Sequence, residues 1–246
     1  MSAEQVPRPS AQRLQRRVTG SSTSLQLIAI DLDGTLVDSV KDLHQAVIRM
    51  QSSLSLAQAS EADVLSWVGN GIDRLVHRAL TGEMHTDAEP IRFAQASEIF
   101  RQSYKDLLGH YSSLYPGVLE GLDWMTGLSV PLVVVTNKDA AFANDLLKQM
   151  GFRHYFRHVI GGDDVAVKKP APEGLLLAAQ QCSADPQHSL LIGDSISDFK
   201  AAVAAGFLCV GLSYGYNHGR EIASLDASES PDAVLDSFRE LPALLA

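Results

Sequence analysis

Apolar residues along this chain follow two spacings, one typical of buried strands and the other of helices. Short runs rich in branched residues predict strands over 25–30, 132–135, 157–161, 189–193 and 208–213. Between them, apolar positions recur every three or four residues and predict helices over 117–128, 139–150, 172–182, 196–205 and about 232–245. Regular alternation of strand and helix is typical of α/β proteins. We therefore expect a doubly wound parallel sheet, an α/β fold.

Residues 40–110 interrupt this alternation. Helical spacing recurs over 42–54, 61–68, 71–80 and 91–108, and no convincing strand lies between these segments. Leu43, Val47 and Met50 illustrate the apolar face of the first of these helices. We expect an inserted α-helical domain over 40–115 and an α/β domain made of 25–39 and 116–246. The chain is expected to cross between the two domains near 39–40 and 112–116.

Composition and charge narrow the classes of protein to which the chain can belong. Residues 1–24 are rich in arginine and serine and lack an apolar segment, so we expect a disordered tail and no secretory signal. The net charge of −9 argues against nucleic-acid binding. No apolar run approaches the roughly 18 residues that a membrane span needs. Cys182 and Cys209 lack metal-ligand spacing, which predicts free thiols in a reducing compartment and hence a cytoplasmic protein.

Two carboxylates directly follow the first predicted strand. Asp31 and Asp33 come after the apolar run that ends at Ile30, and Gly34 permits a sharp turn behind them. Alternate side chains on an extended segment point to the same side. In open α/β sheets, ligands bind at this carboxyl edge of the strands. The pair therefore suits either a divalent cation or a nucleophile beside a proton carrier.

Three further polar motifs follow or precede predicted elements at the same edge. Thr136 and Asn137 end a valine-rich strand, where a hydroxyl and backbone N–H groups can donate to phosphate oxygens; a helix-capping turn explains them equally well. Lys169 stands before a predicted helix, where it can neutralise a phosphate or remain a solvated surface lysine. Asp194 and Asp198 have i, i+4 spacing over a helix start, and helix capping accounts for only one of them.

The order of these motifs resembles that of a known family. The segment 31–37, Asp-Leu-Asp-Gly-Thr-Leu-Val, is similar to the first motif of the haloacid-dehalogenase-like phosphohydrolases. The later threonine, lysine–proline and Gly-Asp-x-x-x-Asp motifs follow in that family's order and narrow the resemblance to the phosphoglycolate phosphatase group. The resemblance covers roughly 25–240. It implies that the inserted helical domain is a mobile cap over the active site.

A metal ion is expected where the acidic residues meet. Four acids at one sheet edge would repel each other unless a cation lay between them, and hard oxygen ligands favour Mg²⁺. The resemblance implies that this Mg²⁺ is bound by the side chains of Asp31 and Asp194 and by the backbone carbonyl of Asp33. It also implies that Asp198 acts behind these ligands, where it orients water and holds Lys169.

The resemblance also implies a role for each remaining motif residue. Asp31 attacks the phosphorus atom and forms an aspartyl-phosphate, while Lys169 helps to keep it ionised. Asp33 protonates the departing alkoxide and then removes a proton from the water that hydrolyses the intermediate. Thr136 and the amide of Asn137 bind the oxygens of the transferring phosphoryl group.

A glycine-containing segment of the helical domain is the candidate for substrate choice. Residues 67–71, Trp-Val-Gly-Asn-Gly, resemble the cap loop of phosphoglycolate phosphatases, and Arg74 one turn later can bind a small carboxylate. The alternative is a helix-breaking turn, with Trp67 in the core of the cap and Arg74 in solvent. The sequence leaves both interpretations open.

The sequence thus predicts an enzyme, a Mg²⁺-dependent phosphoric monoester hydrolase whose partner is a small phosphorylated metabolite. The resemblance implies 2-phosphoglycolate as substrate, and sugar phosphates, amino-sugar phosphates and pyrophosphate are the alternatives. A catalytically idle binding or regulatory protein of the same fold is a different class of hypothesis. Such a protein is expected to lack Asp31, Asp33 or Lys169, and all three are present. We expect a monomer or a homodimer.

Overall fold

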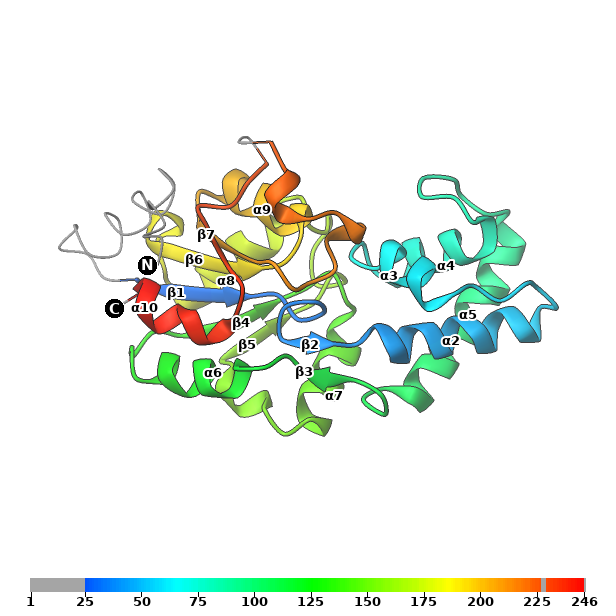
Figure 1. The fold of residues 1–246 in the computed structure, drawn as a ribbon, viewed down its shortest axis with the longest axis horizontal. Coiled ribbons are helices and arrows are strands. Elements are labelled where there is room, and N and C mark those ends of the chain that lie inside the picture. The colour runs from blue at the N-terminus through cyan, green and yellow to red at the C-terminus, as the bar shows by residue number, and fades with distance from the viewer. Residues whose placement is uncertain (1–24, 227–228, 246) are drawn as a thin grey trace, which may run out of the picture.

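The computed structural model describes residues 25–226 and 229–245 (Figure 1). The tail expected over 1–24 lies outside the described residues. Within them, a six-stranded sheet has the strand order β5-β4-β1-β6-β7-β8, and every neighbouring pair is parallel. Its strands are β1 (Leu27–Ile30), β4 (Leu132–Val135), β5 (His158–Ile160), β6 (Ser189–Gly193), β7 (Leu208–Leu212) and β8 (Ala233–Leu235). The predicted parallel sheet is confirmed.

Helices cover both faces of this sheet. They are α6 (Val118–Thr126), α7 (Ala140–Gln149) and α10 (Leu241–Leu245) on one face, and α8 (Glu173–Cys182) and α9 (Ile196–Ala205) on the other. Strand β1 shows how the sequence allows this. Ile28 and Ile30 are buried in one apolar cluster, and Leu27 and Ala29 are buried in the other. A strand that is apolar at every position is suited to burial on both faces, so the doubly wound arrangement is also confirmed.

The predicted helix over about 232–245 is wrong in its first part. Residues Ala233–Leu235 form β8, a 3-10 turn follows, and only Leu241–Leu245 are α-helical. The edge of β7 provides the reason, because its backbone groups need partners. The backbone N–H of Asp232 donates to the Cys209 carbonyl at 2.9 Å, and the N–H of Ser213 donates to the Leu235 carbonyl at 3.0 Å. A short edge strand therefore replaces the expected helical turns.

The four predicted helices between 40 and 110 are all present. They are α2 (Val40–Ser53), α3 (Glu61–Trp67), α4 (Ile72–Thr81) and α5 (Pro90–Leu107). Figure 1 shows them grouped together at one end of the molecule, beyond the carboxyl end of β1. Val47, Met50, Phe100 and Tyr104 are buried among them. The domain boundaries at 39–40 and 115–116, and the role of these helices as a cap, stay predictions.

The chain crosses between sheet and helices through a two-stranded ribbon that the sequence did not predict. Strand β2 (Val37–Asp38) pairs antiparallel with β3 (Ser113–Leu114). Next to this ribbon, the fully buried carboxylate of Asp42 accepts hydrogen bonds from the backbone N–H groups of Gly109 and Tyr111, both at 2.7 Å, and from the hydroxyl of Ser112. Asp42 thus fixes the returning segment against the start of α2.

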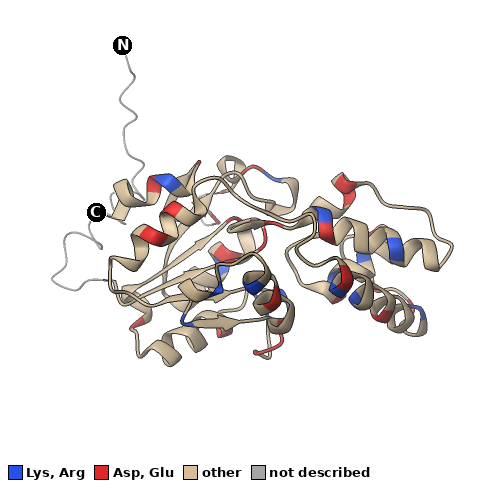
Figure 2. Cartoon of the chain, turned by 90° about the horizontal axis from the view of Figure 1, so that it is seen from below, with Lys and Arg blue, Asp and Glu red and all other residues tan. Residues whose placement is uncertain are grey.

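The distribution of charged residues and the apolar character of the helices can be compared with what the sequence predicts. Figure 2 shows acidic and basic residues interspersed over the elements of both the sheet and the helical part. Among the described residues, no helix has the length and apolar character required to cross a bilayer. Cys182 and Cys209 are both free thiols, as expected. The cytoplasmic location and the monomeric or homodimeric state stay predictions.

Asp42→Ala is expected to lower the free energy of unfolding by about 2–4 kcal/mol, because three donors lose their buried acceptor. Urea denaturation followed by circular dichroism measures this change. Asp145→Ala removes an exposed carboxylate from α7 and serves as the control, with an expected change within about 0.5 kcal/mol. Equal losses in the two variants would contradict the structural role of Asp42.

Candidate active site

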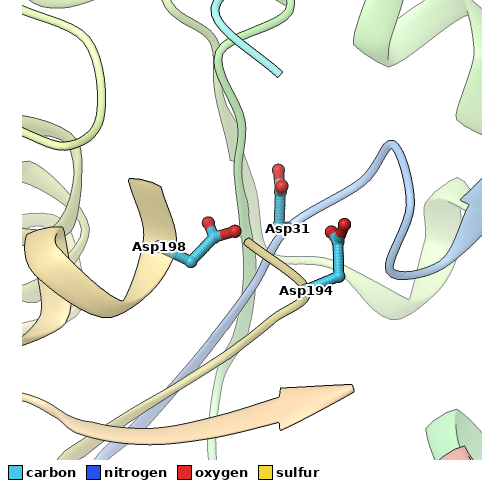
Figure 3. Close-up of side chains that lie close together, drawn as sticks. All are labelled: Asp31, Asp194 and Asp198. Carbon is cyan, nitrogen blue, oxygen red and sulfur yellow. The ribbon is translucent and has the colours of Figure 1, made fainter. Parts of the chain in front are cut away.

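Two strand ends and one helix bring three carboxylates together. Asp31 directly follows β1, Asp194 directly follows β6, and Asp198 lies in the first turn of α9. Because β1 and β6 are neighbours in the sheet, their carboxyl ends lie side by side. One carboxylate oxygen from each residue lies within 4.8 Å of the other two, and all three residues are buried. Figure 3 shows the carboxylate of Asp198 pointing toward Asp31.

Lys169 places a buried positive charge between two of these acids. Its ammonium lies 2.6 Å from Asp198 Oδ1 and 2.9 Å from Asp31 Oδ1, and it donates to the Val135 carbonyl at 2.8 Å. Burial alone would lower the pKa of Lys169, but Asp198 and Asp31 outweigh it and raise the pKa above its usual value. Lys168 is more exposed and lies 3.9 Å from Asp139. Of the two adjacent lysines, Lys169 is the one the structure brings to the acids.

One positive charge does not compensate three buried carboxylates. Burial raises the pKa of Asp31, Lys169 partly offsets this, and Asp198 raises it further. Burial, then Asp198, then Asp31 raise the pKa of Asp194. The buried Oδ1 atom of Asp31 accepts no hydrogen bond from the described residues and has only the ion pair with Lys169. A cluster of three buried carboxylates, with one ammonium beside two of them, fits a metal ion. The three acids can bind one.

Asp33 lies outside this cluster and has different partners. Both of its carboxylate oxygens accept hydrogen bonds at 2.8 Å from the ammonium of Lys138, and the hydroxyl of Ser39 donates to one of them. We did not predict a role for Lys138 or Ser39. The available signal for Lys138 was its position directly after Thr136 and Asn137 at the end of β4.

A pocket joins the predicted residues from the sheet to the helical domain. Its volume is about 440 Å³, including its open mouth. The sheet contributes polar side chains at its carboxyl edge: Asp31, Asp33, Thr136, Asn137 and Lys138. The helical domain contributes apolar side chains and glycines: Leu43, Val68, Gly69, Gly71, Ile72 and Leu75. The structure therefore brings two of the predicted acids, Asp31 and Asp33, and the predicted phosphate-binding pair Thr136 and Asn137 to one pocket.

The glycine-containing loop lies directly against the sheet edge. The side-chain amide of Asn137 donates to the Gly69 carbonyl at 2.8 Å and to the Lys169 carbonyl at 2.9 Å. Gly71 has a φ of +85°, and a Cβ atom there would lie 2.7 Å from the ammonium of Lys168. A side chain at this position would be strained by the positive φ and would displace the end of Lys168. The guanidinium of Arg78, a residue of α4, donates to the side chain of Asn70 at 2.8 Å and so fixes the loop to the helical domain.

Arg74 is not brought to the pocket. Its guanidinium donates to Asp87 Oδ1 at 2.6 Å, on the exposed side of the helical domain, and it is not among the pocket-lining residues. Trp67 is buried. The structure thus agrees with one part of each interpretation that the sequence left open. The loop adjoins the site, as in the cap-loop interpretation, whereas Trp67 is buried and Arg74 lies away from the pocket, as in the alternative. Binding of a carboxylate by Arg74 stays a prediction.

Tyr216 connects the acidic cluster to the crossing into the helical domain. Its backbone N–H donates to Asp194 Oδ2 at 2.8 Å. Its hydroxyl accepts from the backbone N–H groups of Ser39, at 2.7 Å, and Val40, at 3.0 Å, and donates to Asp38 at 2.9 Å. The sequence shows only a Gly-Tyr-Asn segment after the β7 region, with no pattern that indicates these contacts.

Known proteins are similar to this chain in sequence and in fold. The model of the haloacid dehalogenase-like hydrolases matches residues 25–206. A phosphoglycolate phosphatase of Nitrosococcus oceani is 46% identical over 90% of this chain and 96% of its own length. One from Pseudomonas putida is also 46% identical, over 88% of this chain and 78% of its own length.

Solved structures agree with these relatives. The crystal structure of a predicted phosphoglycolate phosphatase from Haemophilus somnus is 33% identical, has a TM-score of 0.84, and is matched over 92% of this chain and all of its own. That of CbbY from Rhodobacter sphaeroides, in complex with phosphate, is 25% identical with a TM-score of 0.73, over 90% of this chain and 99% of its own. The chain therefore belongs to the haloacid dehalogenase-like hydrolase family and is a phosphatase of its phosphoglycolate phosphatase group.

Proposed function

We propose that this phosphatase hydrolyses 2-phosphoglycolate to glycolate and phosphate, with Mg²⁺ as cofactor and Asp31 as nucleophile. The observation that carries the proposal is the convergence of Asp31, Asp194 and Asp198 with Lys169 at the edge of a pocket that also holds Asp33. The relatives named phosphoglycolate phosphatase support the choice of substrate. The phosphate complex of the Rhodobacter protein supports the phosphate chemistry.

The metal would be held by the carboxylates of Asp31 and Asp194 and by the backbone carbonyl of Asp33, with Asp198 behind them. Oxygen donors of this kind suit Mg²⁺. Thr35 and Tyr216 orient Asp194, since the Thr35 hydroxyl donates to its Oδ1 and the Tyr216 N–H to its Oδ2, both at 2.8 Å. When bound, Mg²⁺ supplies positive charge to the reacting phosphate oxygens.

Asp31 provides the nucleophilic oxygen. Lys169 favours its ionised form and fixes its position, because the ammonium is itself held by Asp198 and by the Val135 carbonyl. A new bond forms between the Asp31 carboxylate and phosphorus, while the ester bond from phosphorus to the leaving oxygen breaks. In the second half, water attacks phosphorus and releases Asp31 and inorganic phosphate.

Asp33 moves the protons of both halves. It gives a proton to the departing alkoxide and then takes one from the attacking water. Thr136 is buried at the pocket, and its hydroxyl accepts a hydrogen bond from the Lys138 N–H at 3.2 Å, which leaves its own proton for a phosphoryl oxygen. The Asn137 side chain is used by two carbonyls, so its backbone N–H is the group proposed to bind the phosphoryl.

The helical domain is proposed to act as the cap that selects a small leaving group. The loop around Gly69 and Gly71 touches the sheet edge, and Leu43, Ile72 and Leu75 supply apolar walls. Because the Asn137 side chain contacts the Gly69 carbonyl, the part of the substrate beyond the phosphate would lie beside this loop. The choice of a small leaving group rests on the relatives named phosphoglycolate phosphatase.

Among esters tested with Mg²⁺, 2-phosphoglycolate is expected to have a kcat/KM at least tenfold above a hexose phosphate, an amino-sugar phosphate or pyrophosphate, about 1.4 kcal/mol of discrimination. Asp31→Asn is expected to lose about 10³-fold or more in kcat, because the nucleophile is gone. The exposed Asp145→Asn is the control and should match the parent. A different leading ester would contradict the substrate, and an active Asp31→Asn would contradict the mechanism.

Metal-free protein is expected to lose stability as pH rises. The folded-state pKa values of Asp31 and Asp194 are raised above the ordinary 3.8, so the folded protein keeps protons that the unfolded chain has lost. The contribution of these two groups to stability is therefore fully present below that value and is lost as pH rises through their folded-state pKa values. The melting temperature in a chelator should fall between about pH 5 and about pH 8.

Added Mg²⁺ is expected to reverse this loss, because it binds the ionised carboxylates of the folded state. A hundredfold excess over Kd adds about 2.7 kcal/mol. Scanning calorimetry with and without Mg²⁺, at about pH 5 and about pH 8, measures the change in melting temperature. Asp194→Asn should show a smaller dependence on pH and a smaller response to Mg²⁺. A parent protein that Mg²⁺ leaves unchanged at the higher pH would contradict the metal site.

A further inference from the structure

A buried lysine lies where the sheet edge meets the helical domain. Lys138 follows β4, and only 3% of its side chain is exposed. Its ammonium donates to both oxygens of Asp33 at 2.8 Å and lies 5.0 Å from the ring centroid of Tyr104, which belongs to α5. A cation over an aromatic face is held in place without losing its charge. Lys138 therefore touches the proposed proton carrier and the proposed cap at once.

Lys138 differs from the other residues of the pocket in its charge. Among the residues that line the pocket, all of which lie in the described ranges, Lys138 alone carries a positive charge. Lys169 lies behind Asp31 and is turned to Asp198. The remaining wall beyond the phosphate-binding edge is made of apolar side chains and glycines. A second anionic group on a substrate would thus find one cationic partner in this pocket.

The contact between Lys138 and Asp33 conflicts with the proposed role of Asp33 as the proton donor to the leaving group. A proton donor needs one carboxylate oxygen that faces the leaving group and carries a proton. Here both oxygens accept hydrogen bonds from the same ammonium. Burial alone would lower the pKa of Lys138, but Asp33 and Tyr104 raise it above its usual value, so the lysine remains charged. An anion that competes with Asp33 for the ammonium would resolve the conflict.

We propose that Lys138 is the residue that recognises the carboxylate of the leaving group. When the substrate enters, its carboxylate takes the ammonium over from Asp33, and one Asp33 oxygen becomes free. That oxygen then faces the departing alkoxide and is available for the proton transfer proposed above for Asp33. Hydrolysis then depends on a leaving group that carries an anion close to the ester oxygen.

This inference rests on the proposed function, because it names the group by which the site selects 2-phosphoglycolate. It assigns to Lys138 the task that the sequence suggested for Arg74. Arg74 is paired with Asp87 and does not line the pocket, whereas Lys138 does. The distance from phosphate to carboxylate in a two-carbon ester is short, which agrees with a lysine only one residue after the proposed phosphate-binding pair Thr136 and Asn137.

The test compares three substrates on Lys138→Met. One is 2-phosphoglycolate, the second is 2-hydroxyethyl phosphate, which replaces the carboxylate by a neutral group, and the third is p-nitrophenyl phosphate, whose leaving group departs without a proton. For the variant, kcat/KM on 2-phosphoglycolate is expected to fall about 100-fold, and on 2-hydroxyethyl phosphate to change by less than about threefold. The preference for the carboxylate should thus nearly vanish.

The controls separate recognition from other roles of the lysine. Lys148→Met alters an exposed lysine on α7 and should match the parent on all three substrates. Lys138→Gln, which keeps a hydrogen-bond donor for Asp33, should show the same loss of preference. If Lys138→Met has a lowered melting temperature or an altered circular dichroism spectrum, Lys138→Gln takes its place in the test. The deciding quantity is again the ratio of kcat/KM on 2-phosphoglycolate to kcat/KM on 2-hydroxyethyl phosphate.

Two results would overturn the proposal, and they are distinguishable. If the variants lose activity equally on both alkyl phosphates and keep it on p-nitrophenyl phosphate, Lys138 only positions Asp33, and the proposed function stands. If the parent enzyme itself does not prefer 2-phosphoglycolate to 2-hydroxyethyl phosphate, the proposed function fails, and recognition by Lys138 fails with it.

Discussion

The burial of like charges at the ends of β1 and β6 is the constraint on which the site depends. Asp31, Asp194 and Asp198 are all buried, and the backbone closes tightly around them. A Cβ atom at Gly193 would lie 2.5 Å from Asp198 Cγ, and one at Gly215 would lie 2.1 Å from Asp194 Cβ. Side chains are excluded from these positions by space. The carboxylates are thus held by the chain itself, and positive charge has to come from Lys169 and a metal ion.

The sequence was most informative where chemistry follows directly from topology. A parallel sheet gathers the carboxyl ends of its strands, so motifs that follow β1, β4 and β6 had to meet at one edge. This is why Asp31, Thr136 and Asp194 could be placed together from the sequence. The branched residues of β1 and β4 also fixed the doubly wound arrangement, because strands buried on both faces need helices on both sides.

Contacts between side chains were less predictable, because they depend on which partner is nearer in space. Helical spacing placed Arg74 one turn after the loop, but Asp87, which is far along the chain, binds it. Lys138 and Tyr216 contact Asp33 and Asp194, and no spacing within the sequence indicates these two contacts. The edge strand β8 was missed for a similar reason. Three apolar residues fit a helix or a strand equally well, and backbone pairing with β7 decides between the two.

The position of β1 in the middle of the sheet has a consequence for how the chain folds. Strand β1 pairs with β4 and β6, and the chain makes all of α2 to α5 before it reaches either partner. During synthesis, the fully buried strand β1 therefore emerges before either of its partners in the sheet. Helices α2 to α5 contact one another locally and can form at once, whereas the sheet must wait for distant segments. The nascent chain is accordingly most exposed to aggregation while β1 awaits β6.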